Sequence, residues 1–237
     1  MGTPVPEVAG NLTKMILPVL FPTVFLLQQT KTTPTKEAPQ APPFQKEIQA
    51  FKDADKKQMP AKNQILLIGS STFTNWKDVN DYFPNKQILN RAFGGSSLPD
   101  LIRYADDLLD PYQPRQVVIY CGENDIAGDS KLSANDVYIR FVKFYRILRK
   151  KLPTTPVLYV SAKPSWSRWH LRAKFLSLNN WIREFSSKEP NTDYVDTWSV
   201  MLTPQGVPDQ SIFNKDELHM NASGYKRWVP VLEPKLK

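Results

Sequence analysis

Four short polar segments of the sequence contain groups that could together cleave an acyl bond. Ser70 and Ser71 supply hydroxyl groups in the segment GSST, and the segment NRAFGGSS brings two adjacent glycines with bare backbone amides. Asn124 lies in GEND, and the segment DELH places Asp216 three residues before His219. Serine-based nucleophilic catalysis needs a hydroxyl, an imidazole and a carboxylate. The set therefore indicates attack by a serine on a carbonyl carbon.

Each of these residue types has a reason to take part in such chemistry. A serine hydroxyl attacks only when a base removes its proton, and His219 is the candidate base for Ser71. Asp216 would hold the Nδ1–H group of His219 and stabilise the imidazolium that forms. The tetrahedral intermediate carries negative charge on the former carbonyl oxygen, so it needs hydrogen-bond donors. We expect these donors to be the backbone N–H groups of Ser71 and Gly95 and the side-chain amide of Asn124.

The four segments follow predicted strands. From residue 64 onward, short β-rich apolar runs alternate with helical stretches, a pattern typical of a parallel sheet covered by helices on both faces. In such a sheet the ligand site lies beyond the carboxyl ends of the strands. The sequence therefore predicts an α/β protein with a three-layer α/β/α sandwich. The predicted strands are residues 64–69, 86–90, 116–122, 157–162 and 193–198, and the predicted helices are residues 99–109, 133–152, 168–188 and 224–236.

The same segments, in this order, resemble the four sequence blocks of the SGNH (GDSL-like) hydrolase superfamily. Ser71 matches the nucleophile position, and Gly95 matches the glycine of the second block. Asn124 matches the asparagine of the third block, and Asp216 and His219 match the closing Asp-x-x-His. Any one block alone would be a weak signal, but four blocks in the right order, each at a predicted strand end, are specific.

The resemblance covers roughly residue 64 to the C-terminus. It implies a flavodoxin-like sandwich with a five-stranded parallel sheet, the hydrolysis of carboxylic esters and thioesters, and a reaction that uses no metal or other cofactor. Ser70 stands where the family usually has aspartate, as in a GSS-type subgroup, which leaves the nucleophile open between Ser71 and Ser70, with Ser71 favoured. The rival by chain order is the α/β-hydrolase fold, whose G-x-S-x-G elbow requires a glycine where Phe73 stands.

The resemblance suits a serine esterase acting on a lysophospholipid, an acetylated carbohydrate or a small acyl ester. Trp166, Arg168 and Trp169 follow the fourth predicted strand and could form a substrate wall with an anion grip from the arginine. Packing of these aromatic rings on the sheet edge is the alternative. We expect His170 to be a surface histidine and Cys121 a buried strand residue. The alternative function is a catalytically silent ligand-binding module on the same scaffold.

Composition and charge limit other classes of function. The chain has 237 residues and a formal net charge of +8, which favours anionic surfaces, but no nucleic-acid motif accompanies this charge. We therefore expect no nucleic-acid partner. The single cysteine rules out an internal disulfide and a cysteine-based zinc cluster, and two histidines make a His-rich metal site a poor fit.

The composition divides the chain into three parts. Residues 1–43 contain an apolar run followed by a stretch of Gln, Thr, Lys and Pro, and we expect them to be a disordered leader and linker. Residues 44–63 are expected to form a lead-in helix, because apolar residues recur there at helical spacing. Residues 64–237 form the predicted hydrolase-like domain.

The apolar run Met15–Leu27 has the character of a secretory signal. It is shorter than the ~20 residues that a bilayer-spanning helix needs, and Pro18 and Pro22 interrupt it. We therefore expect export to the periplasm or the cell exterior, or tethering to a membrane through this leader. Because no A-x-A cleavage site follows the run, a cytoplasmic location stays open as the alternative.

Overall fold

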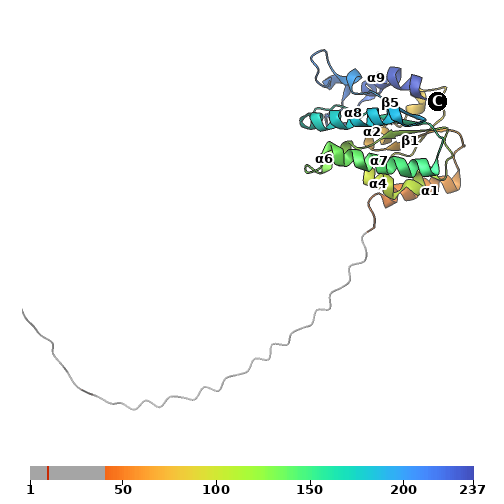
Figure 1. Ribbon diagram of the computed structural model, residues 1–237, viewed down its shortest axis with the longest axis horizontal. Helices are drawn as coiled ribbons and strands as arrows, with labels where there is room; N and C mark the ends of the chain where they lie inside the picture. The colour runs from red at the N-terminus through yellow and green to blue at the C-terminus, as the bar shows by residue number, and fades with distance from the viewer. Residues whose placement is uncertain (1–9, 11–40) are drawn as a thin grey trace, which may run out of the picture. The chain divides into compact units, whose positions relative to one another are not determined.

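Five parallel strands form a single sheet in the part of the chain that this computed structural model describes, which is Gly10 and residues 41–237 (Figure 1). The strand order is β2-β1-β3-β4-β5, and every neighbouring pair is parallel. The chain thus passes from β1 to its neighbour β2 and then crosses past β1 to β3 on the other side. The strands are β1 (Ile65–Gly69), β2 (Ile88–Asn90), β3 (Gln116–Tyr120), β4 (Val157–Val160) and β5 (Thr192–Val195).

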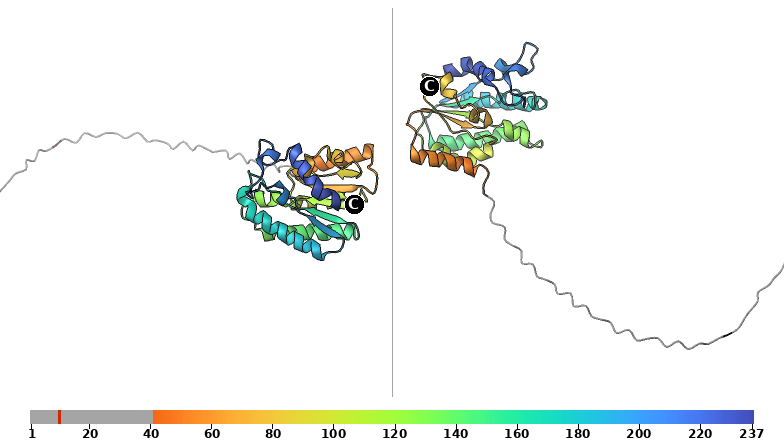
Figure 2. Two further views of the ribbon diagram at one scale, coloured as in Figure 1. Left: turned by 90° about the horizontal axis from the view of Figure 1, so that it is seen from above. Right: turned by 180° about the vertical axis from the view of Figure 1, so that it is seen from behind.

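Helices cover both faces of the sheet, because the central strands are apolar on both sides. Leu66 and Ile68 of β1 belong to one hydrophobic cluster, and Ile65 and Leu67 belong to the other. Figure 2 shows the sheet between the two helical layers from further sides. The helices packed on the first cluster are α1 (Gln45–Lys57), α4 (Leu98–Arg103), α5 (Ala105–Leu109), α6 (Glu123–Gly128), α7 (Ala134–Lys151) and α8 (Arg172–Lys188), and those on the second are α2 (Ser71–Thr74), α3 (Val79–Tyr82) and α9 (Ala222–Leu232).

The predicted three-layer α/β/α sandwich with five parallel strands is confirmed. All five predicted strands are present, each with slightly different ends. Three predicted helices differ in detail. The helix predicted over 224–236 is α9, which ends at Leu232 and is followed by a 3-10 turn, Glu233–Lys235. The helix predicted over 99–109 is broken at Tyr104, which has φ −105° and ψ 20°, so it forms α4 and α5. The helix predicted over 168–188 begins instead with a single 3-10 turn, Trp169–Leu171, which leads into α8.

A buried ion pair joins α1 to the loop that follows β2. Asp55 Oδ1 lies 2.5 Å from Arg91 Nη2, and Asp55 Oδ2 accepts a hydrogen bond from the Tyr112 hydroxyl at 2.6 Å. Asp55 is only 8% exposed, although it lies in a helix with a mostly polar sequence. Residues 41–237 form one unit, so α1 is part of the same body as the sheet. Breaking such a buried pair typically costs ~3–5 kcal/mol, so α1 braces the segment that carries the two adjacent glycines.

The leader Met15–Leu27, with its expected role in export or membrane tethering, lies outside the residues that the structure describes. In the described part of the chain, none of the helices combines the length and the apolar character needed to cross a bilayer.

Candidate active site

The strand order reverses between β1 and β3, and the segments that follow these two strands meet at that point. In open parallel sheets such a reversal leaves a crevice beyond the carboxyl ends of the strands. Gly69 closes β1 with φ +132°, and a Cβ atom added there would come 1.9 Å from the carbonyl oxygen of Tyr120. Only glycine fits this close approach. Ser70 then continues in an extended conformation, and Ser71 opens α2 at the edge of the sheet.

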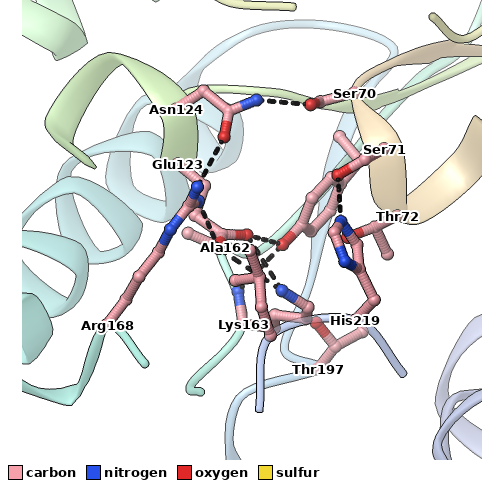
Figure 3. A network of polar contacts seen from close by, with 12 residues as sticks. Ser70, Ser71, Thr72, Glu123, Asn124, Ala162, Lys163, Arg168, Thr197 and His219 are labelled. Carbon is pink, nitrogen blue, oxygen red and sulfur yellow. Dashed lines mark hydrogen bonds and ion pairs between the residues drawn. The ribbon is translucent and has the colours of Figure 1, made fainter. Parts of the chain in front are cut away.

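Ser71, His219 and Asp216 form a continuous hydrogen-bonded chain at this edge. Ser71 Oγ lies 3.0 Å from His219 Nε2, although the two residues are 148 positions apart in the sequence (Figure 3). His219 Nδ1 lies 2.6 Å from Asp216 Oδ2. Because a carboxylate only accepts, Nδ1 carries the hydrogen and Nε2 presents a lone pair to the serine. The structure therefore brings together the hydroxyl, imidazole and carboxylate expected from the sequence.

Backbone groups hold Asp216 in its charged form. Its partial burial raises the pKa, but the hydrogen bonds from the His219 ring and from the N–H groups of His219 and Leu218 outweigh this and lower the pKa to about 2. Those N–H groups lie 2.9 and 3.0 Å from Asp216 Oδ1. A lowered pKa stabilises the fold above the ordinary pKa of 3.8, and this contribution is lost as the pH falls toward 2. The carboxylate next to His219 is thus charged at neutral pH.

The two candidate serines occupy different environments. Ser71 is half-buried and faces His219, whereas Ser70 is 3% exposed and its Oγ accepts a hydrogen bond from Asn124 Nδ2 at 2.6 Å. The sequence left the nucleophile open between them. The structure places Ser71, and not Ser70, against the imidazole.

The loop that contains Gly94 and Gly95 lies directly beside Ser71. A Cβ atom added to Gly94 would come 3.9 Å from Ser71 Cβ, so the backbone of this loop passes close to the serine. Gly95 has φ +86°, and an added Cβ there would face the ring of Phe44 at 3.7 Å. Ser96 Oγ donates to the carbonyl oxygen of Gly69 at 3.0 Å and so ties the loop to the end of β1. Sequence reasoning singled out Gly95 alone, whereas Gly94 is the closer neighbour of Ser71.

Asn124 contacts the serine turn directly. Its Nδ2 atom donates to Ser70 Oγ at 2.6 Å and to the carbonyl oxygen of Ser96 at 3.0 Å. Its Oδ1 atom accepts from Arg168 Nη2 at 3.0 Å. Asn124 therefore contacts the segments that follow β1, β2 and β4, and it is half-buried.

A buried charged cluster lies next to Asn124, and it was not among the features predicted from the sequence. Glu123 is 4% exposed, and its carboxylate contacts Lys163 Nζ at 3.2 Å, Arg168 Nη1 at 2.7 Å and the hydroxyl of Tyr120. Burial alone would raise the pKa of Glu123, but the charges of Lys163 and Arg168 and the Tyr120 hydrogen bond hold it below its usual value. A polar residue directly after each of two neighbouring strands, in GEND and in AKPS, is the signal that could have found this cluster.

Only part of the substrate wall expected from the sequence is available to a substrate, because two of its three residues make internal contacts. The guanidinium of Arg168 is held by Glu123 and Asn124, so its contacts are internal and do not form the open anion grip expected from the sequence. The ring of Trp169 stacks on Trp198 with centroids 5.9 Å apart, which is the packing alternative. Trp166 remains 36% exposed. Of the three residues, Trp166 is the one that is exposed.

Two other residues that the sequence singled out lie where they were expected. His170 is exposed, and Cys121 is 3% exposed just after β3. Burial raises the pKa of the Cys121 thiol well above its usual value. Across residues 41–237, no group of three or more His, Cys, Asp or Glu side chains lies in an arrangement that could hold a metal ion.

The fold and the matching sequence profile define an enzyme that hydrolyses esters. The profile of the GDSL-like lipase/acylhydrolase family matches residues 68–227. The chain therefore belongs to the GDSL-like lipase/acylhydrolase family, and the resemblance seen in its four sequence segments is confirmed. No curated protein matches the sequence.

Solved structures share the fold at low sequence identity. A protein from Streptococcus pneumonia, provisionally assigned as a platelet activating factor, superposes with a TM-score of 0.71 at 20% identity, covering 81% of this chain and 92% of that one. A GDSL-like lipase from Bacteroides thetaiotaomicron has a TM-score of 0.66 at 17% identity, covering 80% and 98%. A carbohydrate esterase family 3 protein from Talaromyces cellulolyticus has a TM-score of 0.57 at 15% identity, covering 73% and 96%. Likeness at these identities shows the fold.

Proposed function

We propose that this protein hydrolyses carboxylic esters through an acyl-enzyme intermediate on Ser71. The observation that carries the proposal is the 3.0 Å contact between Ser71 Oγ and His219 Nε2, with Asp216 on the other side of the ring. As Ser71 Oγ attacks the acyl carbon, His219 takes its proton. His219 then gives this proton to the departing alcohol. A water molecule, deprotonated by His219, attacks the acyl-enzyme, and the proton returns to Ser71 as the acid leaves.

The negative charge of the tetrahedral intermediate needs donors at the same place. We assign this role to the backbone N–H groups of Ser71 and Gly95 and to the side-chain amide of Asn124. In the free protein, Asn124 Nδ2 donates to Ser70 Oγ and to the carbonyl oxygen of Ser96. An oxyanion accepts a hydrogen bond more strongly than a neutral hydroxyl does. We therefore expect one amide hydrogen to move from Ser70 to the oxyanion. Loss of one such donor typically costs ~10²–10³ in rate.

The preferred substrate in this proposal is a short acyl ester of a carbohydrate or of another small alcohol. The imidazole of His219 and the carboxylate of Asp216 lie near the surface, since their side chains are 27% and 48% exposed. Trp166 is exposed on a loop that touches the same turn, because Ser167 N–H donates to the carbonyl oxygen of Glu217 at 3.3 Å. An aromatic face beside an open site suits a sugar ring. Carbohydrate esterases are also among the proteins with the same fold.

A chain-length series tests this proposal. We expect p-nitrophenyl acetate to be hydrolysed with a higher kcat/KM than the butyrate, octanoate and decanoate esters, and acetylated xylooligosaccharides to release acetate. Replacing Trp166 by alanine should raise KM for the acetylated sugar and change KM for p-nitrophenyl acetate little. A kcat/KM that rises with chain length, together with cleavage of lysophosphatidylcholine, would instead identify a lipid ester as the substrate.

A further inference from the structure

Arg168 connects the buried charged cluster to the one side-chain amide of the proposed oxyanion hole. We propose that Arg168 is a positioning residue for Asn124, and that Glu123, Lys163 and Tyr120 form the anchor that holds its guanidinium. This inference rests on the proposed function, in which Asn124 stabilises the oxyanion. Arg168 itself need not touch the substrate, because its guanidinium contacts lie on the side of Asn124 that faces away from Ser70 (Figure 3).

The hydrogen-bond partners of Asn124 determine which end of its amide faces the serines. A side-chain amide can turn over and exchange its nitrogen and oxygen with little change in shape. A guanidinium only donates, so the amide atom 3.0 Å from Arg168 Nη2 must be the oxygen. The carbonyl oxygen of Ser96 only accepts, so the atom 3.0 Å from it must be the nitrogen. With the amide turned over, its oxygen would face the oxyanion and repel it.

The Arg168 guanidinium is fixed by a second contact. Its Nη1 atom lies 2.7 Å from Glu123 Oε1, while Nη2 reaches Asn124, so one rigid group spans two consecutive residues. A planar fork of this kind loses less freedom for each hydrogen bond than a lysine does. A lysine at this position has one nitrogen and could not reproduce both contacts with the same geometry. The pair of contacts therefore sets where the amide lies as well as which way it faces.

The anchor is buried, and together with Arg168 it carries an excess of positive charge. The Glu123 carboxylate is 5% exposed as a side chain, and Lys163 approaches both of its oxygens, at 3.3 and 3.2 Å. Lys163 is itself 1% exposed. Two cations thus surround one carboxylate immediately behind Asn124. This arrangement favours a negative charge on the substrate side of the amide, where the oxyanion develops.

The loop that carries Arg168 also touches the turn that carries the base. The contact from Ser167 N–H to Glu217 holds the loop beside Asp216 and His219. Because Arg168 is bound to Glu123, which follows β3, these contacts hold three segments in fixed positions relative to one another. They are the segments after β3, after β4 and before α9. A merely structural role would lower stability without a specific effect on the chemical step, so the two roles can be separated by kinetics.

The test is a double-mutant cycle with the neutral substrate p-nitrophenyl acetate. In Arg168→Lys we expect kcat to fall roughly 10- to 100-fold with KM little changed, which is less than the ~10²–10³ loss of a whole donor. The same substitution in an Asn124→Ala background should cause little further loss, because Arg168 acts through Asn124. In Arg168→Ala, added guanidinium should restore part of kcat, and it should not do so once Asn124 is also alanine.

Arg172→Lys is the matched control. Its guanidinium lies over the ring of Trp169 at 5.3 Å, and Arg172 is exposed, so kcat should be unchanged. Losses at Arg168 and Asn124 that simply multiply would overturn the inference, as would an unchanged kcat in Arg168→Lys or in Asn124→Ala. If Arg168→Lys raises KM for anionic esters only, the residue binds substrate and the inference is wrong.

The same series separates this inference from the proposed function. If Ser71→Ala is inactive but the Arg168 and Asn124 effects are independent, the inference fails and the serine mechanism stands. If Ser71→Ala hydrolyses the ester as fast as the unmodified protein, the proposed function fails. Circular dichroism and thermal melting of each variant show whether it folds, and guanidinium rescue of Arg168→Ala gives a readout that unfolded protein cannot produce.

Discussion

Replacing Ser71 by alanine is expected to lower kcat for p-nitrophenyl acetate by roughly 10⁴- to 10⁶-fold, the range seen when a serine nucleophile is removed. Ser71 Oγ is the hydroxyl that faces His219 Nε2, at 3.0 Å, and alanine leaves no atom to form the acyl-enzyme. The side chain is small and half-buried, so the fold should be retained. Steady-state rates, with melting temperature as a check on folding, measure the effect.

Ser70→Ala is the matched control for this variant, one residue earlier in the same turn. The Ser70 hydroxyl accepts from Asn124 and makes no contact with His219 among the described hydrogen bonds. Its removal frees an amide hydrogen for the oxyanion, so kcat should be unchanged or slightly higher. A large loss in Ser70→Ala with retained activity in Ser71→Ala would move the nucleophile to Ser70.

His219→Ala is expected to be as damaging as Ser71→Ala, because the serine then has no base to take its proton. Members of such a unit act together, so the double variant Ser71→Ala/His219→Ala should be no slower than either single one. Asp216→Asn should be milder, up to about 10⁴-fold, because the imidazole remains. The carboxylate is 48% exposed, so water can partly replace it.

His170→Ala is the control for the base, and it should leave the rate nearly unchanged, since His170 is exposed on the 3-10 turn before α8. A full rate in His219→Ala with a loss in His170→Ala would show that the wrong base had been identified.

The low pKa of Asp216 also bears on how the rate depends on pH. Since that carboxylate stays charged on mild acidification, a loss of rate there belongs to another group.

The sequence predicted most of the residues at the carboxyl edge of the sheet because each follows an apolar run directly. Ser71 follows β1, Asn124 follows β3, and the parallel sheet brings these ends together. The closing Asp-x-x-His needed only the spacing between Asp216 and His219, since backbone N–H groups within the same turn bind the carboxylate. Local pattern and the geometry of the fold sufficed for these side chains.

The partners of Arg168 and Asp55 could not be predicted in the same way. Arg168 meets Glu123 45 positions away, and Asp55 meets Arg91 36 positions away, so neither pair leaves a periodic signal. Asp55 also lies on the buried side of α1, seven residues after Ile48, where a charged residue is unusual. The short helices α2 and α3 contain only four residues each, too few for a helical period to show. Tertiary packing decides all of these features.

Reaction with a fluorophosphonate, followed by mass mapping of the peptides, tests the central proposal most directly. Such a reagent reacts with a serine that a neighbouring base has activated, forming an oxygen–phosphorus bond and releasing fluoride. We predict a single adduct on Ser71, lost in His219→Ala and retained in Ser70→Ala. An adduct on Ser70 or elsewhere, or folded protein that neither reacts nor hydrolyses esters, would contradict the assignment, and the second result would favour a silent binding module.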